Sequence, residues 1–272
     1  TLKDSTRIGL DVPVWMTEGL VDIVTAGVGW IPFEMPIREF VEAAEGTGVQ
    51  VYGCIEALRP CSDDNAVRAA SHRFWEAGAG IYLYNFFTMP VEWKKRMLTQ
   101  LGDPKSLARK DKRYELDHSD RIQYPGHGGA FRNAVPPVQL PITLHETHTA
   151  RGPILRMDIA DDMETAVSEN SVDRCILGIT LDHFSPIDEY AVRVNKKDYP
   201  WESSRTSSSG QTTSWPALAG KHSIEYDIEP DVLKQGKNEI EIQLISSGDR
   251  QTTPPTLIGV EITITYKSDT KS

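Results

Sequence analysis

The sequence predicts an α/β region followed by an all-β region: part of a (β/α)8 TIM barrel with about four βα units, then an antiparallel β-sandwich or jelly roll. Three observations indicate this division. Residues 1–116 alternate short apolar runs with helix-like stretches, residues 117–140 are rich in glycine and proline and lack periodicity, and residues 141–272 alternate apolar and polar side chains. We therefore expect a partial barrel, a linker and a sandwich domain.

The apolar runs of the first region are nearly continuous, which is typical of parallel strands that are buried on both faces. Strands are expected at residues 7–12, 20–26, 49–56 and 80–86. Helices are expected at residues 14–19, 36–45, 66–77, 91–101 and 106–110. Pro13 and Pro36 lie near helix starts, and glycines follow several helix ends, as helix boundaries require. A closed barrel needs eight βα units, so this region can form only part of one.

The second region has the period-two alternation of strands with one buried face. Ile240, Ile242 and Leu244, for example, alternate with polar side chains. Strands are expected at residues 141–146, 154–159, 173–181, 189–194, 223–228, 239–245 and 257–266. Many short strands without a long helix between them predict an antiparallel sandwich.

The composition is that of a folded globular protein, and it excludes several functional classes. Of the 272 residues, 39% are hydrophobic and 25% are charged, so a disordered chain is not expected. The net charge of −10 argues against nucleic acid as a partner. No apolar run is long enough to cross a bilayer, and the N-terminus has no signal-peptide core, so we expect a soluble chain without membrane insertion.

The three cysteines, Cys54, Cys61 and Cys175, have spacings that fit neither a disulfide framework nor a zinc site. No phosphate-binding glycine loop, nucleophile-elbow serine or Cys/His pair stands out, so no cofactor is predicted. The cysteines favour a reducing compartment but also fit a protein exported from a bacterial cell, which leaves the compartment open. The chain begins at Thr1 rather than Met, as a processed or excised piece would.

Glu56 is the candidate catalytic residue. Active sites of parallel α/β barrels lie at the C-terminal ends of the strands, and Glu56 ends the strand expected at residues 49–56. Strand alternation places it on the same face as Tyr52 and Cys54, opposite the aliphatic side chains that would face the helices. A carboxylate there is suited to glycoside hydrolysis. The alternative is an ordinary loop carboxylate that pairs with Arg59.

Five further side chains lie at or after the C-terminal ends of the expected strands and are candidates for substrate contact: Asp11, Trp30, Glu34, Arg59 and Asn85. Four of them also have a structural explanation. Asp11 can cap the next helix, Glu34 precedes a helix N-terminus, and Trp30 can either stack on a sugar ring or pack beneath its loop. Asn85 can donate to a ligand hydroxyl or simply end its strand.

The candidate metal ligands are weaker. His145 and His148 have the spacing of a ligand pair but no evident third ligand. Asp161, Asp162 and Glu164 form an acidic cluster that a solvated turn explains better than calcium does. No metal site is therefore predicted.

Four segments carry a family resemblance. LDVPVWMTEGLVDIV, FEMPIREFVEAAEGTGVQVYGCIEALRP, AGAGIYLYNFF and LGDPKSLARKDKRYELD resemble the second half of the barrel in bacterial family 10 glycosylhydrolase-like proteins, which carry a β-sandwich behind the barrel. The most characteristic phrases run from Trp15 to Asp22 and from Gly102 to Tyr114. The later segment YDIEPDVLKQGKNEIEIQL, with Gly236 and Asn238, is similar to galactose-binding-like, carbohydrate-binding jelly rolls.

The resemblance implies that residues 1–116 supply the equivalents of strands five to eight, with Glu56 after the seventh strand, where related retaining glycosidases keep the nucleophile. The acid/base partner of such enzymes follows the fourth strand, which this sequence does not contain. A second chain or a missing N-terminal segment would then have to complete the barrel and cover its open sheet edges.

The expected function is that of a glycoside-hydrolase-like protein that acts on a glycan, with carbohydrate as its partner. It would be an O-glycosyl hydrolase if the full barrel is completed. The alternative is a non-catalytic carbohydrate-binding or structural module that needs a partner chain.

Overall fold

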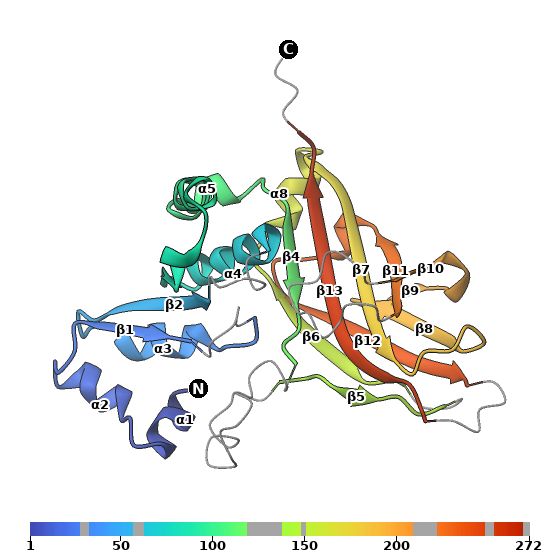
Figure 1. Ribbon diagram of the computed structural model, residues 1–272, viewed down its shortest axis with the longest axis horizontal. Helices are drawn as coiled ribbons and strands as arrows, with labels where there is room; N and C mark the ends of the chain where they lie inside the picture. The colour runs from blue at the N-terminus through green and yellow to red at the C-terminus, as the bar shows by residue number, and fades with distance from the viewer. Residues whose placement is uncertain are drawn as a thin grey trace.

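The computed structural model describes residues 1–27, 33–56, 63–118, 138–147, 151–208, 222–247 and 253–268. Within them, one small parallel sheet lies beside two larger antiparallel sheets (Figure 1). The helices gather around the parallel sheet, and the antiparallel sheets contain most of the strand residues.

The parallel sheet has the order β1 (Ile23–Ala26), β2 (Gln50–Glu56), β3 (Gly80–Tyr84). Helix α3 (Ile37–Ala44) connects β1 to β2, and α4 (Asp64–Glu76) connects β2 to β3. The remaining helices of this region are α1 (Leu2–Arg7), α2 (Val12–Thr17), η1 (Phe86–Thr88), α5 (Val91–Leu101) and α6 (Pro104–Leu107).

Helix α4 packs closely against one face of β2. Val51 and Ile55 on that face are buried, and a Cβ atom at Gly53 would lie 2.4 Å from the ring of Phe74. Glycine is therefore required where the helix crosses the strand. The opposite face of the sheet carries the side chains of Tyr52, Cys54 and Glu56.

The first antiparallel sheet has the order β10-β11-β7-β13-β4, with β5 also paired to β13. Its strands are β4 (Lys112–Glu115), β5 (Ile142–Thr143), β7 (Val172–Asp182), β10 (Arg205–Ser208), β11 (His222–Ile228) and β13 (Thr256–Tyr266).

The second antiparallel sheet has the order β6-β12-β8-β9. Its strands are β6 (Ile154–Ile159), β8 (Glu189–Val194), β9 (Lys197–Tyr199) and β12 (Gly236–Ser246). Short helices α8 (Met163–Ser168), η2 (Trp201–Ser203) and η4 (Pro230–Val232) connect strands.

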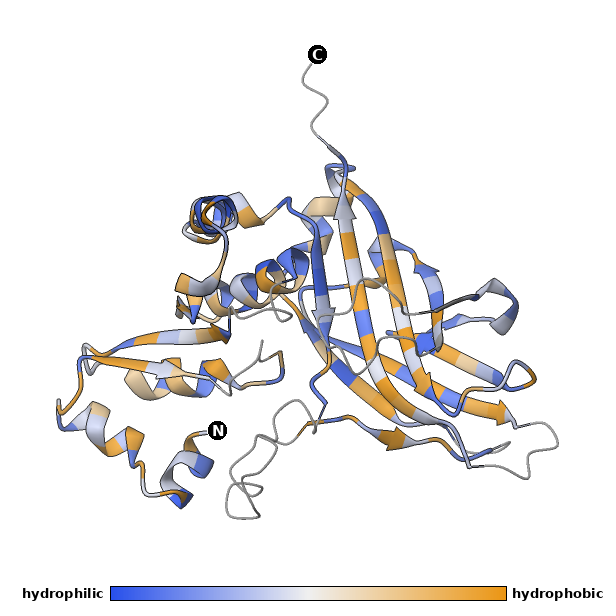
Figure 2. Ribbon diagram, viewed as in Figure 1, coloured by the Kyte–Doolittle hydropathy of each residue, from blue (hydrophilic) through white to orange (hydrophobic). Residues whose placement is uncertain are grey.

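The two antiparallel sheets contribute alternate side chains to a common apolar core. Leu177 and Ile179 of β7, Ile262 of β13, and Ile240 and Ile242 of β12 are all buried in it. Figure 2 shows the resulting alternation of hydrophobic and hydrophilic residues along these strands. The arrangement is that of a β-sandwich.

Strand β4 joins the two regions, because it follows the helices in sequence but pairs with β13 near the end of the chain (Figure 1). A buried polar cluster lies where they meet. The Asp161 carboxylate accepts hydrogen bonds from Lys112 Nζ at 2.8 Å and from the hydroxyls of Tyr114 and Tyr266, each at 2.5 Å. Lys112 and Asp161 have no exposed side-chain surface.

The prediction of a partial (β/α)8 barrel is wrong. The described residues form an open parallel sheet of three strands, and the other strands belong to antiparallel sheets. Residues 7–12 are not a strand: α1 ends at Arg7, α2 begins at Val12, and Ile8 and Leu10 are exposed. Asp11 caps α2, so a local helix start prevails over the short apolar alternation.

Candidate functional site

Glu56 lies at the C-terminal end of β2 and is 7% exposed. Asn85 follows β3 directly, and its Nδ2 atom donates to both carboxylate oxygens of Glu56, each at 3.1 Å. Asn85 has a φ of 55°, in the left-handed region that asparagine adopts more readily than most residues. This turn brings the amide back over the neighbouring strand, so the ends of β2 and β3 are joined by one carboxylate–amide pair.

The register of the sheet places Glu56 on the face that points away from α4. Cys54 is the neighbour of Tyr82 and Glu56 is the neighbour of Tyr84, so these side chains share one face. We call this surface the open face; it comprises Ile23, Thr25, Gln50, Tyr52, Cys54, Glu56, Tyr82 and Tyr84. Tyr82 and Tyr84 are 46% and 50% exposed. The site thus combines a buried carboxylate, an amide donor and exposed aromatic rings.

The thiol of Cys54 is not suited to nucleophilic chemistry. Burial, with a smaller contribution from the negative charge of Glu56, raises the pKa of Cys54 to about 11. A Cβ atom at Gly27 would lie 2.5 Å from the Cβ of Cys54, so the backbone after β1 crosses close above this side chain. The thiol remains protonated near neutral pH and acts as part of the packing.

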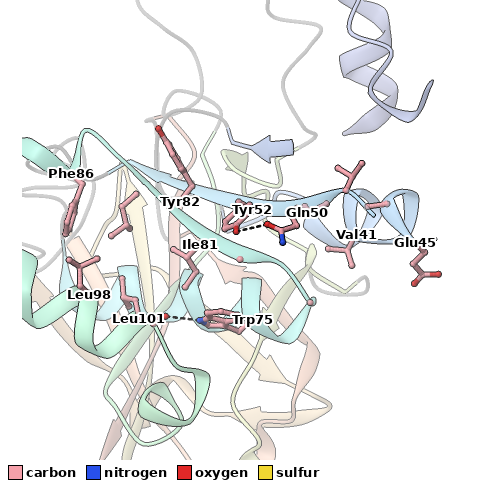
Figure 3. Close-up of a pocket in the computed structure, with 17 residues that line it drawn as sticks. Val41, Glu45, Gln50, Tyr52, Trp75, Ile81, Tyr82, Phe86, Leu98 and Leu101 are labelled. Carbon is pink, nitrogen blue, oxygen red and sulfur yellow. Dashed lines mark hydrogen bonds between the residues drawn. The ribbon is translucent and has the colours of Figure 1, made fainter. Parts of the chain in front are cut away.

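An open groove of about 840 Å³ follows β3, which is an edge strand among the described residues. Tyr82 points to the open face and Ile81 to the opposite side, where Leu98 and Leu101 of α5 lie across from the strand (Figure 3). Tyr52 and Tyr82 line this groove, whereas Glu56 does not.

Two of the predicted contact residues bind backbone groups. The Asp11 carboxylate caps α2 by accepting from the backbone N–H of Val14 at 3.5 Å, as its structural alternative predicts. Glu34 accepts from the backbone N–H of Asp117 at 2.7 Å and from Gln139 Nε2 at 2.6 Å. These contacts give both carboxylates a structural role.

The contact between Glu34 and Asp117 is reciprocal, because the Asp117 carboxylate accepts from the backbone N–H groups of Phe33 at 3.2 Å and Glu34 at 2.7 Å. Gln139 in turn pairs with the backbone of Arg156 on β6. Burial, and then the charge of Asp117, raises the pKa of Glu34 to about 7. We call this arrangement the Glu34–Asp117 clasp.

Of the remaining candidates, some lie outside the described residues and others belong to other parts of the fold. Trp30 and Arg59 lie outside the described residues, so the expected pairing of Arg59 with Glu56 is outside them too, and the same holds for His148. Asp161 belongs to the buried cluster, whereas Asp162 caps α8. Across the part of the chain that the structure describes, no three His, Cys, Asp or Glu side chains are arranged to hold a metal ion.

Sequence reasoning missed the tyrosines of the open face. Tyr82 and Tyr84 alternate with Ile81 and Leu83 in the strand, so the period-two pattern that placed Glu56 could also have identified them. It missed Lys112 as well, since a lysine in a short charged strand gives no sign of complete burial.

No protein-family model and no curated protein matches this chain. A β-porphyranase of glycoside hydrolase family 86 from the human gut bacterium Bacteroides plebeius is similar in structure, with 10% identity and a TM-score of 0.31. The match covers 58% of this chain and 21% of that one. A likeness of this extent carries no argument about function. That enzyme belongs to family 86, so the comparisons do not confirm the resemblance to family 10 proteins.

No helix among the described residues has the length and apolar composition needed to span a membrane.

Proposed function

We propose that this chain is a glycoside-hydrolase-like protein that acts on a glycan, and that the Glu56 carboxylate contacts the sugar. One observation carries the proposal: Glu56 and Asn85 are hydrogen-bonded at the C-terminal ends of two adjacent parallel strands, beside the exposed ring of Tyr84. Carboxylates, amides and aromatic rings are the groups that recognise sugar hydroxyls and sugar ring faces.

The geometry of the pair supports a defined role for each residue. Two hydrogen bonds from one amide group fix the orientation of the Glu56 carboxylate, as a nucleophile or general base requires. Asn85 is a positioning residue because it acts through Glu56.

Hydrolysis also requires a second carboxyl group, about 5–5.5 Å away for a retaining enzyme and ~6.5–9.5 Å away for an inverting one. Of the predicted contact residues, Asp11 caps a helix and Glu34 belongs to the clasp. Because neither carboxylate is available as the second catalytic group, a second candidate function is a carbohydrate-binding protein that does not cleave its ligand.

Glu56→Gln tests both candidates. If the chain is a hydrolase, the amide cannot act as nucleophile or base, and we expect release of reducing sugar to fall by at least about a hundredfold. Glu92→Gln, at an exposed position on α5, is the matched control and should leave release unchanged. Glycan binding by the unaltered chain without any release would instead support the binding protein. Release that Glu56→Gln leaves unchanged would remove Glu56 from the mechanism.

A further inference from the structure

Three tyrosine rings stand in a row along β3. Tyr82 and Tyr84 project from the strand itself onto the open face. The third ring belongs to Tyr52 of β2, which is the register neighbour of Gly80. Residues two apart on a strand are separated by about 6.6 Å, so the three positions along β3 are evenly spaced.

Gly80 makes the third position possible. A Cβ atom there would lie 2.5 Å from the ring of Tyr52, so the ring leans over the glycine into the place that a β3 side chain would occupy. The Tyr52 hydroxyl donates to Gln50 Oε1 at 3.2 Å, which holds the ring in this orientation (Figure 3). The row therefore runs from Tyr52 through Tyr82 to Tyr84, and it ends beside Glu56.

The charge of the open face limits what the row can bind. Glu56 is the only charged side chain among the residues that define this face, and the whole chain carries a net charge of −10. A sulfated or uronic-acid polymer would be repelled by both. An uncharged ligand with flat apolar faces and hydroxyl edges suits the tyrosines, whose rings are apolar and whose hydroxyls form hydrogen bonds.

We propose that the tyrosine row binds a linear, uncharged glycan that extends along β3, with one sugar ring over each tyrosine and one end at Glu56 and Asn85. The inference rests on the proposed function, because it names the substrate class of the same site. The even spacing of the three positions along β3 favours an extended chain over a single sugar.

Binding measurements on the purified chain test this substrate class. The probes are three soluble neutral polysaccharides, mixed-linkage β-glucan, hydroxyethyl cellulose and laminarin, and two anionic ones, alginate and κ-carrageenan, in affinity electrophoresis followed by calorimetry. We expect binding to at least one neutral probe and none to the anionic probes. Glu92→Gln, at an exposed position on α5, should retain neutral binding.

The variants separate stacking from other contributions. Tyr82→Ala and Tyr84→Ala should each weaken neutral binding by about two- to tenfold, and Tyr82→Phe should preserve it. Gly80→Ala should also weaken binding, because its methyl group displaces the ring of Tyr52. Ile187→Ala is the control: this side chain is 62% exposed, on a loop of the sandwich. Circular dichroism checks that each variant folds.

The outcomes distinguish this inference from the proposed function. Binding to the anionic probes alone, or neutral binding that both alanine variants leave intact, would overturn the tyrosine row while a glycan function survived. Absence of binding to any glycan would end both proposals. Sedimentation showing a dimer that Tyr82→Ala dissociates would also overturn the inference, because the row would then be an interface between two copies.

Discussion

At the scale of single residues, the carboxylates of this chain differ mainly in what their oxygens accept. Asp11, Glu34 and Asp117 all accept hydrogen bonds from backbone N–H groups. Glu56 accepts from the side chain of Asn85 at the C-terminal ends of two adjacent parallel strands, next to the exposed Tyr84. This position leads us to assign function to Glu56 rather than to the other acidic candidates.

The Glu34–Asp117 clasp should make the unfolding free energy depend on pH. The pKa of Glu34 rises from its ordinary value of 4.5 to about 7 in the folded chain, so folding favours the protonated carboxyl. The stability that this group contributes is fully present below about pH 4.5 and is lost as the pH rises through 7. Glu34→Gln should therefore flatten the pH dependence of the unfolding free energy between these values.

Urea titrations at several pH values measure this effect, with Glu42→Gln on the exposed side of α3 as the control. The same slope in Glu34→Gln and in the unaltered chain would show that the clasp does not titrate in this range.

At the scale of elements, strands with a clear alternation were predicted within a few residues. Both β6 and β8 occupy the predicted positions, 154–159 and 189–194. The errors have local causes. Strand β4 was missed because Lys112, Arg113 and Glu115 are charged, and Lys112 and Arg113 form ion pairs with Asp161 and Glu261, which lie far along the chain. The clasp was also unpredictable, since it joins positions 83 residues apart.

The contact between β2 and α4 gives a prediction at this scale. A methyl group in Gly53→Ala would overlap the ring of Phe74, which the helix backbone holds in place. We expect a loss of about 1–3 kcal/mol in the unfolding free energy. Thr25→Ala, on the open face of the same sheet, should change stability far less. The urea midpoints of both variants test this contact. Equal midpoints would show that α4 does not pack closely against Gly53 of β2.

At the scale of the whole molecule, the buried cluster around Asp161 joins the helical region to the sandwich. Burial alone would raise the pKa of Asp161, but the charge of Lys112 and the hydrogen bonds around the carboxylate hold it below its ordinary value. Burial lowers the pKa of Lys112, which Asp161 partly offsets. Each charge therefore requires the other.

Asp161→Asn leaves the buried ammonium of Lys112 without its counter-charge. We expect the free energy of unfolding to fall by about 3–5 kcal/mol. Because Lys112 Nζ also donates to the carbonyl oxygen of Leu107 in α6, while Tyr266 of β13 donates to Asp161, the loss should appear in one cooperative transition rather than in one region alone. Asp162→Asn, which retains a capping side chain at α8, should have a small effect. Calorimetry in which only part of the molecule melts early would contradict this coupling.

The placement of the site was partly predictable. Strand alternation placed Glu56 at the end of β2 on the face away from the helices, and the structure gives it that position. Its pairing with Asn85 follows from the left-handed turn after β3, which the sequence pattern does not reveal. The barrel was predicted wrongly because the alternation of strands and helices in the sequence identifies single βα units. It does not show how many of their strands pair in one parallel sheet, and a barrel depends on that number.

A crystal structure of the chain soaked with a neutral oligosaccharide that it binds tests the role of Glu56 most directly. We expect sugar density over Tyr82 and Tyr84, with a hydroxyl or ring atom within hydrogen-bond distance of the Glu56 carboxylate. Sugar bound only on the sandwich sheets, or an open face covered by protein with Glu56 sealed beneath it, would contradict the assignment of Glu56.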